Sequence, residues 1–521
     1  MTGGRLALGI DIGTTAVKAL VLNADTGTFA TATADSHQLR SLHAGWAEED
    51  PADWVRGAVQ AVRRLGADAG VPLSDIGAIG VSGMVPAVVA LDASRRPVRL
   101  SIQQNDARTV AELASIGQAW PADSIFDRAG STLNQQHVLP KLLWLRAHEP
   151  GSWARITCVV GSYDYVRGWL TGHYAVERNW AVESGLYDVR RGAWMDDLLR
   201  AFDINADLLG GTVDPWDITG MLQPEAAAAL GLVPSIPVLA GSADHVASAL
   251  ACGVAEPGDT LIKFGGAGDL LYCTDRPVFH PDLYFDYHDL PGRYLLNGCM
   301  AASGSLVRWL LDRFGATEAD TSELSKAAAA IGPGSDGLVV LPYFLGEKTP
   351  VLDPAARGVI FGLLLHHGDA HLFRAVLESV VYGFRHHIDV LESAGHRVGT
   401  VLAGNGGARS PLWRQIAADV LGRPVTAFPA HPGSALGVAY LAAQGAGLNP
   451  RCTIESITAA DAVVHRPDAQ AHRVYDTGYQ IYRELYRSTR HLLPLAAALS
   501  EPEAVPTSSG PVPPAEGATH D

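Results

Sequence analysis

Near its start the chain places an acidic residue, a glycine turn and two hydroxyl groups between two runs of apolar residues. The apolar runs predict two strands, over residues 6–12 and 16–22, that pair as a hairpin. The turn between them, Gly13-Thr14-Thr15, can offer backbone N–H groups and hydroxyls to an anion. The segment therefore predicts a turn that holds the phosphates of a nucleotide.

Two charged residues flank this turn. Asp11 lies where its carboxylate could hold Mg²⁺ through water, and Lys18 could reach a phosphoryl group during its transfer. An ordinary β-hairpin with a capped turn would show the same pattern, so this segment alone leaves both interpretations open.

Two further glycine-rich segments favour the phosphate interpretation. Residues 260–272 repeat the plan of strand, glycine turn and strand, which predicts two related lobes that face a shared cleft. Residues 401–416 predict a strand, a glycine turn and an amphipathic helix whose N-terminus a ligand can approach. Arg409 stands where the dinucleotide-binding fingerprint needs its last glycine. Taken alone this segment could be a structural turn; with the two hairpins it predicts an adenosine pocket.

The length of 521 residues is too great for one core, and alternating strands and helices predict layered α/β lobes. We predict an N-terminal lobe for sugar and phosphate over residues 1–243 and a nucleotide-binding C-terminal lobe over residues 244–490. Residues 491–521 are rich in proline and polar residues, which predicts a disordered tail.

Composition restricts the partners of the chain. The net charge of −16 argues against binding nucleic acid or an anionic membrane. The five cysteines include no C-x-x-C pair, so we expect reduced thiols rather than disulfides or a zinc site. No segment approaches about 18 uninterrupted apolar residues. We therefore expect a cytoplasmic protein.

A single aspartate stands at a predicted junction between the lobes. Asp244 follows a predicted strand over residues 236–240 and a short turn, and it opens an apolar helix that extends to Cys252. An aspartate in this position is often an N-cap that satisfies a free N–H group. It could also be a general base that takes the proton of an acceptor hydroxyl in phosphoryl transfer. The two interpretations are compatible.

Six motifs of the chain resemble those of the FGGY family of carbohydrate kinases, most closely those of its xylulokinases, and they follow one another in the order that the family shows. The resemblance extends over about residues 5–490. Besides the three glycine segments, the motifs are Gly241-Ser242-Ala243-Asp244, Asn105-Asp106-Ala107-Arg108, and Gly346-Glu347-Lys348-Thr349-Pro350 with Arg357-Gly358-Val359-Ile360-Phe361-Gly362.

The resemblance implies an α/β protein with the two-lobed actin/hexokinase-like ATPase fold, made of duplicated ribonuclease-H-like domains around a cleft. It also implies that ATP and Mg²⁺ bind in the cleft, and that the γ-phosphoryl group passes to a sugar or polyol hydroxyl.

Matching positions carry individual roles over to this chain. Asp244 would be the general base, Asp11 would help to hold Mg²⁺, and Lys18 would act on the moving phosphoryl group. The implied nucleotide-binding residues are Gly13, Thr14, Thr15, Gly265, Gly266, Gly268, Gly406, Gly407, Ala408 and Ser410. The implied substrate-binding residues are Met84, Val85, Pro86, Asn105, Asp106, Arg108, Asp244 and His245.

The chain departs from the family pattern in the second phosphate loop. Relatives usually carry Gly-Thr-Ser where this chain has Gly265-Gly266-Ala267, so the loop itself offers phosphate only backbone N–H groups. We expect weaker contacts to ATP there.

A second departure lies in the sugar site. Xylulokinases show Gly-Gln-Met-His-Gly where this chain reads Gly83-Met84-Val85-Pro86-Ala87. Proline has no side-chain donor or acceptor to replace the imidazole. Since an unmatched buried hydroxyl costs on the order of 1–3 kcal/mol, we expect D-xylulose not to be the preferred acceptor.

The sequence leaves the identity of the acceptor open. The main interpretation is an ATP-dependent kinase of a ketopentose or small polyol, and the alternatives within enzymes include ribulose, erythritol and glycerol. A non-catalytic sugar or nucleotide sensor on the same fold is a further alternative, although a sensor needs neither Lys18 nor the base Asp244. The resemblance also allows a homodimer.

Overall fold

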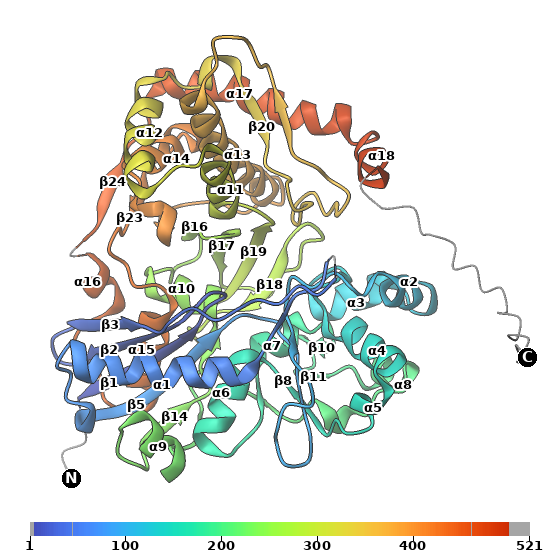
Figure 1. Cartoon of the computed structure of the whole chain (residues 1–521), viewed down its shortest axis with the longest axis vertical. Helices are drawn as coiled ribbons and strands as arrows, with labels where there is room; N and C mark the ends of the chain where they lie inside the picture. The colour runs from blue at the N-terminus through green and yellow to red at the C-terminus, as the bar shows by residue number, and fades with distance from the viewer. Residues whose placement is uncertain (1–4, 44, 460, 500–521) are drawn as a thin grey trace, which may run out of the picture.

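Two α/β lobes lie one above the other in the computed structural model, which describes residues 5–43, 45–459 and 461–499 (Figure 1). The lower lobe contains the predicted N-terminal hairpin, and the upper lobe contains the second glycine hairpin. The expectation of two layered α/β lobes is therefore confirmed.

The first sheet has the strand order β13-β14-β5-β1-β2-β3, with β15 beside β5. Its strands are β1 (Leu6–Ile12), β2 (Val17–Asn23), β3 (Phe29–Thr33), β5 (Ile76–Gly83), β13 (Ile218–Met221), β14 (Pro237–Leu239) and β15 (Ser242–Ala243). The central strands are almost fully buried, because helices cover both faces of the sheet. The packing helices are α1 (Pro51–Asp68), α6 (Ser162–Thr171), α10 (Asp244–Ala251) and α15 (Ser434–Gly445), and α9 (Pro224–Leu230) packs on α1 and α6.

Helix α1 shows why the sequence forms these elements. Asp50 caps its N-terminus by accepting the N–H of Ala52, and Pro51 occupies the first turn, where its missing N–H is not needed. Trp54, Ala58 and Leu65 then lie on one buried stripe that faces the sheet.

The second sheet has the strand order β18-β19-β17-β16-β22-β23-β24. Its strands are β16 (Thr260–Phe264), β17 (Gly268–Thr274), β18 (Tyr284–Tyr287), β19 (Tyr294–Met300), β22 (Val401–Gly404), β23 (Val425–Ala427) and β24 (Val463–His465). The helices of this half are α11 (Gly304–Phe314), α12 (Glu318–Ala330), α13 (Asp369–Ser393), α14 (Pro411–Leu421), α16 (Ile454–Ala459), α17 (Ala469–Thr489) and α18 (Leu493–Ala498).

Shorter elements complete the described chain. The short strands are β4 (Glu48–Glu49), β6 (Val89–Leu91), β7 (Ser101–Ile102), β8 (Cys158–Val160), β9 (Val176–Glu177), β10 (Tyr187–Asp188), β11 (Ala193–Trp194), β12 (Thr212–Val213), β20 (Val339–Leu341) and β21 (Val359–Phe361). The remaining α-helices are α2 (Val110–Ala119), α3 (Ala122–Ala129), α4 (Val138–His148), α5 (Pro150–Trp153), α7 (Arg178–Glu183) and α8 (Asp196–Ala201).

The two sheets share one topology. The order β3-β2-β1-β5-β14 in the first sheet corresponds to β19-β17-β16-β22-β23 in the second. In the first sheet β1 and β2 form an antiparallel hairpin, and β1 also pairs in parallel with β5. In the second sheet β16 and β17 form the hairpin, and β16 pairs in parallel with β22. This correspondence confirms that the glycine hairpins begin two related folding units.

Helix α15 comes late in the chain but packs on the first sheet, against β1, β2, β5 and α10. The contact is close because glycines form it. A Cβ atom added to Gly9 would lie 2.1 Å from the carbonyl oxygen of Ala435, and one added to Gly80 would lie 2.4 Å from that of Val438. The predicted boundary between residues 243 and 244 stays a prediction, and the structure adds that α10 and α15 lie on the first sheet.

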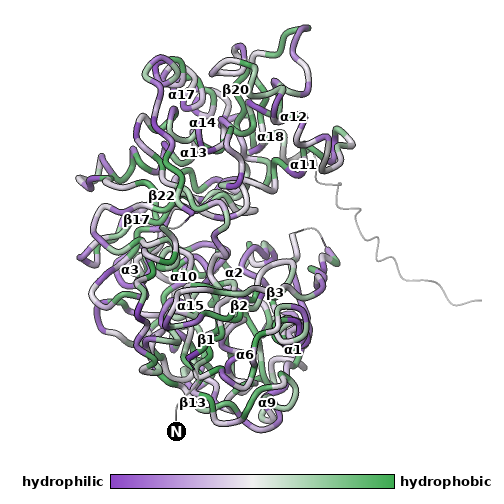
Figure 2. The backbone as a smooth tube through the Cα atoms, turned by 90° about the vertical axis from the view of Figure 1, so that its left-hand side faces the viewer, coloured by the Kyte–Doolittle hydropathy of each residue, from purple (hydrophilic) through white to green (hydrophobic). Residues whose placement is uncertain are grey.

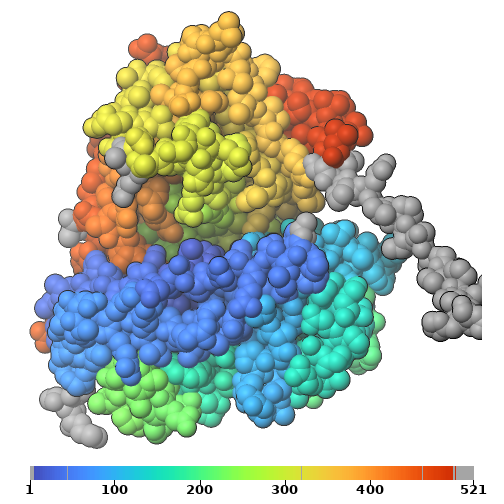
Figure 3. All heavy atoms as spheres, viewed as in Figure 1, coloured from blue at the N-terminus to red at the C-terminus, as the bar shows by residue number. Residues whose placement is uncertain are grey.

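The surface is hollowed between the lobes. In Figure 3 a recess separates the blue N-terminal segments from the yellow and orange segments of the upper lobe. Figure 2 shows hydrophobic segments in both lobes. The largest cluster of buried apolar residues lies mainly in the lower lobe and extends to Leu261, Leu271 and Leu295 of the second sheet, and the next largest lies in the upper lobe. The recess is the shared cleft that the paired hairpins predict.

The described part of the chain contains no helix long and apolar enough to cross a membrane. Its five cysteines are free thiols, in agreement with the expected absence of disulfides. Of the predicted tail, residues 491–499 are described and include α18, while residues 500–521 lie outside the described residues.

Candidate functional site

The first glycine turn connects β1 to β2 and exposes two hydroxyl-bearing side chains. Thr14 and Thr15 are exposed, and Gly13 is partly exposed. Asp11 and Lys18 face each other across the hairpin, one residue pair before the turn. The structure thus brings together all five residues that the sequence assigned to this loop.

Asp11 is buried at the base of the turn. Its Oδ1 accepts a hydrogen bond from the hydroxyl of Ser82 on β5, at 2.9 Å. Burial and the negative charge of Asp244 raise the pKa of Asp11, whereas the ammonium group of Lys18 lowers it. Asp11 and Asp244 therefore influence each other across the interior of the site.

The second glycine loop connects β16 to β17 and is fixed by the start of α11. The backbone N–H groups of Ser303 and Ser305 donate to the carbonyl oxygen of Gly266 at 2.9 and 3.1 Å. The N–H of Gly304 donates to the carbonyl oxygen of Gly265 at 2.8 Å. Gly268 packs closely against Met300, since an added Cβ would lie 2.4 Å from the methyl group of that side chain.

The third glycine segment follows β22. Gly406 borders open space, since an added Cβ would meet no atom within 4 Å. Gly407 packs against Trp413, where an added Cβ would lie 2.5 Å from the indole ring, and Ala408 is fully buried. The hydroxyl of Ser410 caps α14 by accepting the N–H of Trp413 at 3.3 Å. Contact of these residues with a nucleotide stays a prediction, most direct for Gly406.

Asn405 brings the third segment next to the second loop. Its backbone has a φ of +70° and a ψ of −174°, a strained conformation that residues other than glycine rarely adopt. A Cβ added to Gly265 would lie 3.9 Å from the side-chain nitrogen of Asn405. The two glycine segments of the upper lobe are therefore neighbours.

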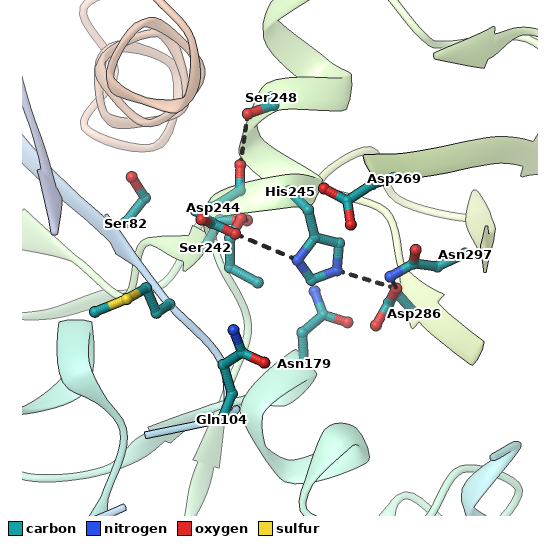
Figure 4. Close-up of polar contacts among 12 residues, drawn as sticks. Ser82, Gln104, Asn179, Ser242, Asp244, His245, Ser248, Asp269, Asp286 and Asn297 are labelled. Carbon is teal, nitrogen blue, oxygen red and sulfur yellow. Dashed lines mark hydrogen bonds and ion pairs between the residues drawn. The ribbon is translucent and has the colours of Figure 1, made fainter. Parts of the chain in front are cut away.

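Asp244 is the first residue of α10. The expectation that its side chain caps this helix is wrong, because Ala243 is the N-cap residue and no side-chain cap bond is present. The Oδ1 atom of the carboxylate instead lies 3.5 Å from Nδ1 of His245 (Figure 4). The same oxygen lies 4.0 Å from Nζ of Lys263. With 32% of its side chain exposed, Asp244 can be reached by a ligand.

These cations keep Asp244 ionised. Enclosure raises the pKa of Asp244, but the Lys263 ammonium and His245 outweigh this effect and lower the pKa to about 2. Burial lowers the pKa of His245, but Asp286, Asp244 and Glu183 raise it well above the usual value. At neutral pH the site thus holds an aspartate anion next to an imidazolium cation.

His245 is the centre of an acidic cluster (Figure 4). Its Nε2 lies 3.1 Å from Oδ2 of Asp286 and 3.5 Å from Oε1 of Glu183. The side-chain amide of Asn297 donates to the same oxygen of Asp286 at 3.1 Å. Ligand atoms of Glu183, His245 and Asp286 lie within 4.8 Å of one another. The ion pairs with Asp286 and Glu183 fix the orientation of the His245 ring.

The predicted sugar loop follows β5. Met84 and Val85 are 4% and 7% exposed, so both side chains belong to the apolar core beneath this part of the site. The ammonium of Lys141 donates to the carbonyl oxygens of Gln136, at 2.9 Å, and of Pro86, at 3.4 Å. Burial lowers the pKa of Lys141 to about 7. The loop is therefore held by a buried lysine that the sequence did not single out.

Asp106 and Arg108 are engaged with the protein itself. Asp106 is fully buried, and its carboxylate accepts the N–H of Ala47 and the guanidinium of Arg108. Arg108 also pairs with Glu48 at 2.7 Å. Asn105, by contrast, is exposed. This pair fixes the loop that carries Asn105, and sugar contacts by the three residues stay predictions.

Gln104 connects the two lobes. Its Oε1 accepts from the side-chain amide of Gln136 at 2.8 Å and from Nζ of Lys348 at 3.4 Å. Lys348 belongs to the upper lobe, whereas both glutamines belong to the lower one. Figure 4 shows the Gln104 side chain extending toward Asp244 and His245. Gln104 is thus a candidate for the polar contact that Pro86 cannot make.

The sequence did not single out several charged residues of the site, namely Glu183, Lys263, Asp269 and Asp286. Lys348 was part of a family motif, but no role in the site was assigned to it. Lys263 offered a usable signal, because it is a charged residue in an apolar strand just before a glycine turn, as Asp11 is. Glu183 and Asp286 offered none, since only the fold brings them to His245.

The donor set at the first turn fits Mg²⁺. This ion binds through one or two carboxylates together with waters and phosphate oxygens. Asp11 supplies one such carboxylate at the base of the turn, held in place by the hydroxyl of Ser82. It is a hard oxygen donor, and no thiolate or neutral imidazole is needed.

Comparisons with known proteins follow the same division into two lobes. Residues 6–251 match the N-terminal domain of the FGGY family of carbohydrate kinases, and residues 265–446 match its C-terminal domain.

Individual relatives match over nearly their whole length. The chain is 30% identical over 493 residues to the xylulose kinase of Bacillus subtilis, covering 94% of this chain and 98% of that one. It is 32% identical over 500 residues to the xylulose kinase of Escherichia coli, covering 94% of this chain and 100% of that one. The crystal structure of xylulose kinase from Rhodospirillum rubrum superposes with a TM-score of 0.83 at 41% identity, covering 94% and 100% of the two chains.

Proposed function

We propose that this chain, which belongs to the FGGY family of carbohydrate kinases and phosphorylates a sugar with ATP, uses Asp244 as its general base. The observation that carries this proposal is a partly exposed carboxylate that two cations keep ionised in the cleft between two glycine hairpins. An ionised carboxylate can accept the proton of a hydroxyl group as that hydroxyl attacks the γ-phosphorus.

The two hairpins would hold the phosphates of ATP. The first turn offers N–H groups with the hydroxyls of Thr14 and Thr15, and Lys18 would approach the transferring group. The second loop would add N–H groups of Gly265 and Gly266, while Gly406 would border the adenosine. Since phosphate-binding groups lie on both sides of the cleft, the phosphoryl group would be transferred between the lobes.

Mg²⁺ would be held by Asp11 and by phosphate oxygens. When bound, the ion would neutralise phosphate charge and orient the β- and γ-phosphates. Asp11 itself is kept in place by the hydroxyl of Ser82, so its carboxylate presents a fixed oxygen.

The acceptor should differ from D-xylulose. Met84, Val85 and Pro86 make the loop apolar, and Gln104 offers an amide from the neighbouring loop. A ketopentose or small polyol that lacks or inverts the hydroxyl facing Pro86 would leave fewer unmatched groups. We expect such a substrate to exceed D-xylulose by at least about tenfold in kcat/KM, equivalent to about 1.4 kcal/mol.

The acceptor is tested by ADP release with ATP and Mg²⁺ over ketopentoses, aldopentoses and polyols of three to five carbons. First rank for D-xylulose with ordinary kinase efficiency would refute the proposed role of Pro86. Absence of turnover with every acceptor would favour a sensor over a kinase.

The general base is tested by Asp244→Asn. Because the amide keeps the shape but cannot accept a proton, kcat should fall by roughly 10²–10⁴ while nucleotide binding is retained. The control is Asp419→Asn, since Asp419 is a buried carboxylate outside the site that accepts hydrogen bonds from Gln415 and Asp468. Turnover of Asp244→Asn within a few-fold of wild type would remove Asp244 from the mechanism.

We also propose a homodimer and keep the prediction of a cytoplasmic location, which fits the five free thiols. Leu363, Leu364 and Leu365 follow β21 and are 56%, 60% and 109% exposed. Consecutive exposed leucines are typical of a contact surface, and a second copy would cover them. Sedimentation velocity should show a dimer for wild type and a monomer for Leu364→Asp with Leu365→Asp.

A further inference from the structure

A buried lysine lies beside the base, and neither a motif nor the resemblance assigned it a role. Lys263 is on β16, two residues before Gly265, and it is 7% exposed. Its ammonium nitrogen lies 4.0 Å from Oδ1 of Asp244 and 3.5 Å from Oδ2 of Asp269. A buried lysine next to a catalytic carboxylate is costly unless its charge is used or balanced.

The two glycine hairpins carry the same pair of charges with the strands exchanged. In the first hairpin Asp11 on the leading strand faces Lys18, one residue pair before the turn. In the second hairpin Lys263 on the leading strand faces Asp269, also one residue pair before the turn. Side chains of directly opposed residues lie on the same face of a sheet. Each lobe thus places one lysine at the base of its phosphate loop.

The ammonium group of Lys263 is held loosely. Usual N–H···O hydrogen bonds have lengths of about 2.7–3.2 Å, and both of its carboxylate contacts are longer. Lysine has three donors on a flexible stem, so it can add a new partner by a small movement. The loop that it supports has no hydroxyl of its own, because Gly266 and Ala267 form its tip.

We propose that Lys263 is a catalytic residue that binds the transferring phosphoryl group from the C-terminal lobe, opposite Lys18 in the N-terminal lobe. The inference rests on the proposed function, since it needs Asp244 as the base. Lys263 would supply the positive contact that the hydroxyl-free second loop lacks.

The balance of charge during the transfer supports this role. The acceptor oxygen forms a bond to the γ-phosphorus, its proton passes to the carboxylate of Asp244, and the bond to the β-phosphate oxygen breaks with its electron pair left on ADP. Once protonated, Asp244 no longer balances the ammonium of Lys263. The ammonium keeps Asp269 as one partner and can then pair with the phosphoryl oxygens at the stage when they carry the developing charge.

The test compares Lys263→Met with Lys263→Arg. Removal of a charged donor to a transition state costs about 10²–10³ in kcat, so Lys263→Met should lose at least about 100-fold in kcat with little change in the KM of the sugar. Lys263→Arg should recover at least a tenth of wild-type kcat. The control is Arg374→Met, which removes another buried cation of the upper lobe, paired with Glu378 at 2.8 Å.

A second variant keeps the lysine and removes its competitor. In Asp269→Asn the ammonium loses one anionic partner, so the variant should bind a nonhydrolysable ATP analogue several-fold more tightly relative to ADP. Lys263→Met should shift the same ratio in the opposite direction. If Lys263→Met does not fold, Lys263→Gln replaces it with the same criteria.

The outcomes separate this inference from the proposed function. Full turnover of Asp244→Asn, or no turnover of wild type with any acceptor, would refute the proposed function. With Asp244 established, a kcat of Lys263→Met within about threefold of wild type, or an unchanged nucleotide ratio in Asp269→Asn, would overturn the role of Lys263 alone.

Discussion

The protonation state of Asp244 depends on its neighbour along the chain. His245 is held as an imidazolium by Asp286 and Glu183, and it lies 3.5 Å from Asp244. The carboxylates of Asp286 and Glu183 therefore keep His245 protonated, and the positive charge of His245 helps to keep Asp244 ionised.

The pH profile should reveal this arrangement. With a pKa of about 2, Asp244 stays ionised from neutral pH down to about pH 4, so its protonation should not lower kcat/KM in that range. In His245→Asn the cation is lost and burial raises the pKa of Asp244. The acidic limb of the kcat/KM profile should then move upward by about one pH unit or more, with about tenfold loss for each unit below the new pKa.

The control for this profile is His288→Asn. His288 is also buried, but its Nε2 bonds the carbonyl oxygen of Val254, and burial lowers its pKa to about 4. Its loss should leave the acidic limb where it is in wild type. An unshifted limb in His245→Asn would show that the imidazolium does not control the base.

Individual residues were the least predictable part of the site. Asp11, Lys18 and Asp244 could be selected because each stands next to a glycine turn or a helix start. Glu183 and Asp286 could not, because their relation to His245 depends on how α7 and β18 pack. The hydroxyl of Ser410 fits a helix cap as well as a ligand contact, and only the structure shows that it caps α14.

At the scale of elements, the contact between α15 and the first sheet depends on the absence of side chains. A Cβ added to Gly437 would lie 2.1 Å from the carbonyl oxygen of Ala247 on α10. Neither backbone can retreat easily, because α10 and α15 are buried and pack on the same sheet. Gly437 is therefore required by close packing between two helices.

Gly437→Ala should destabilise the protein by several kcal/mol, in the range of severe overpacking, even though alanine favours helices. Thermal unfolding measures the change. Gly117→Ala is the matched control, since Gly117 is also helical and an added Cβ there meets no atom within 4 Å. The control should gain about 0.5–1 kcal/mol. Equal melting temperatures for the two variants would contradict the assigned contact.

The strands and helices themselves were largely predictable. The apolar runs flanking the glycine turns gave β1, β2, β16 and β17 nearly to the residue, because strand ends coincide with glycines. The packing of α15 on the first sheet could not be predicted, because helical periodicity identifies a buried face but not the sheet that covers it.

At the scale of the whole molecule, the lobes meet across a cleft that must admit ligands. The bond between Lys348 and Gln104 joins the lobes at 3.4 Å. Transfer needs phosphate-binding groups from both hairpins around one ATP, and it needs water excluded from the γ-phosphate. Ligand binding should therefore draw the lobes together.

Small-angle scattering checks this closure. The radius of gyration should be smaller with sugar and a nonhydrolysable ATP analogue than without ligands, and sugar alone should give a smaller change. Identical scattering profiles in all three states would count against closure. The measurement is independent of Asp244, because it does not need turnover.

The late position of α15 has a consequence for how the protein is made. The part of the first sheet that α15 covers stays open until residues 434–445 have left the ribosome. Apolar surface of β1, β2 and β5 is exposed there while the other half is synthesised. The first lobe cannot complete its packing before the second lobe has been synthesised. The newly made chain therefore depends on protection from aggregation until its final quarter emerges.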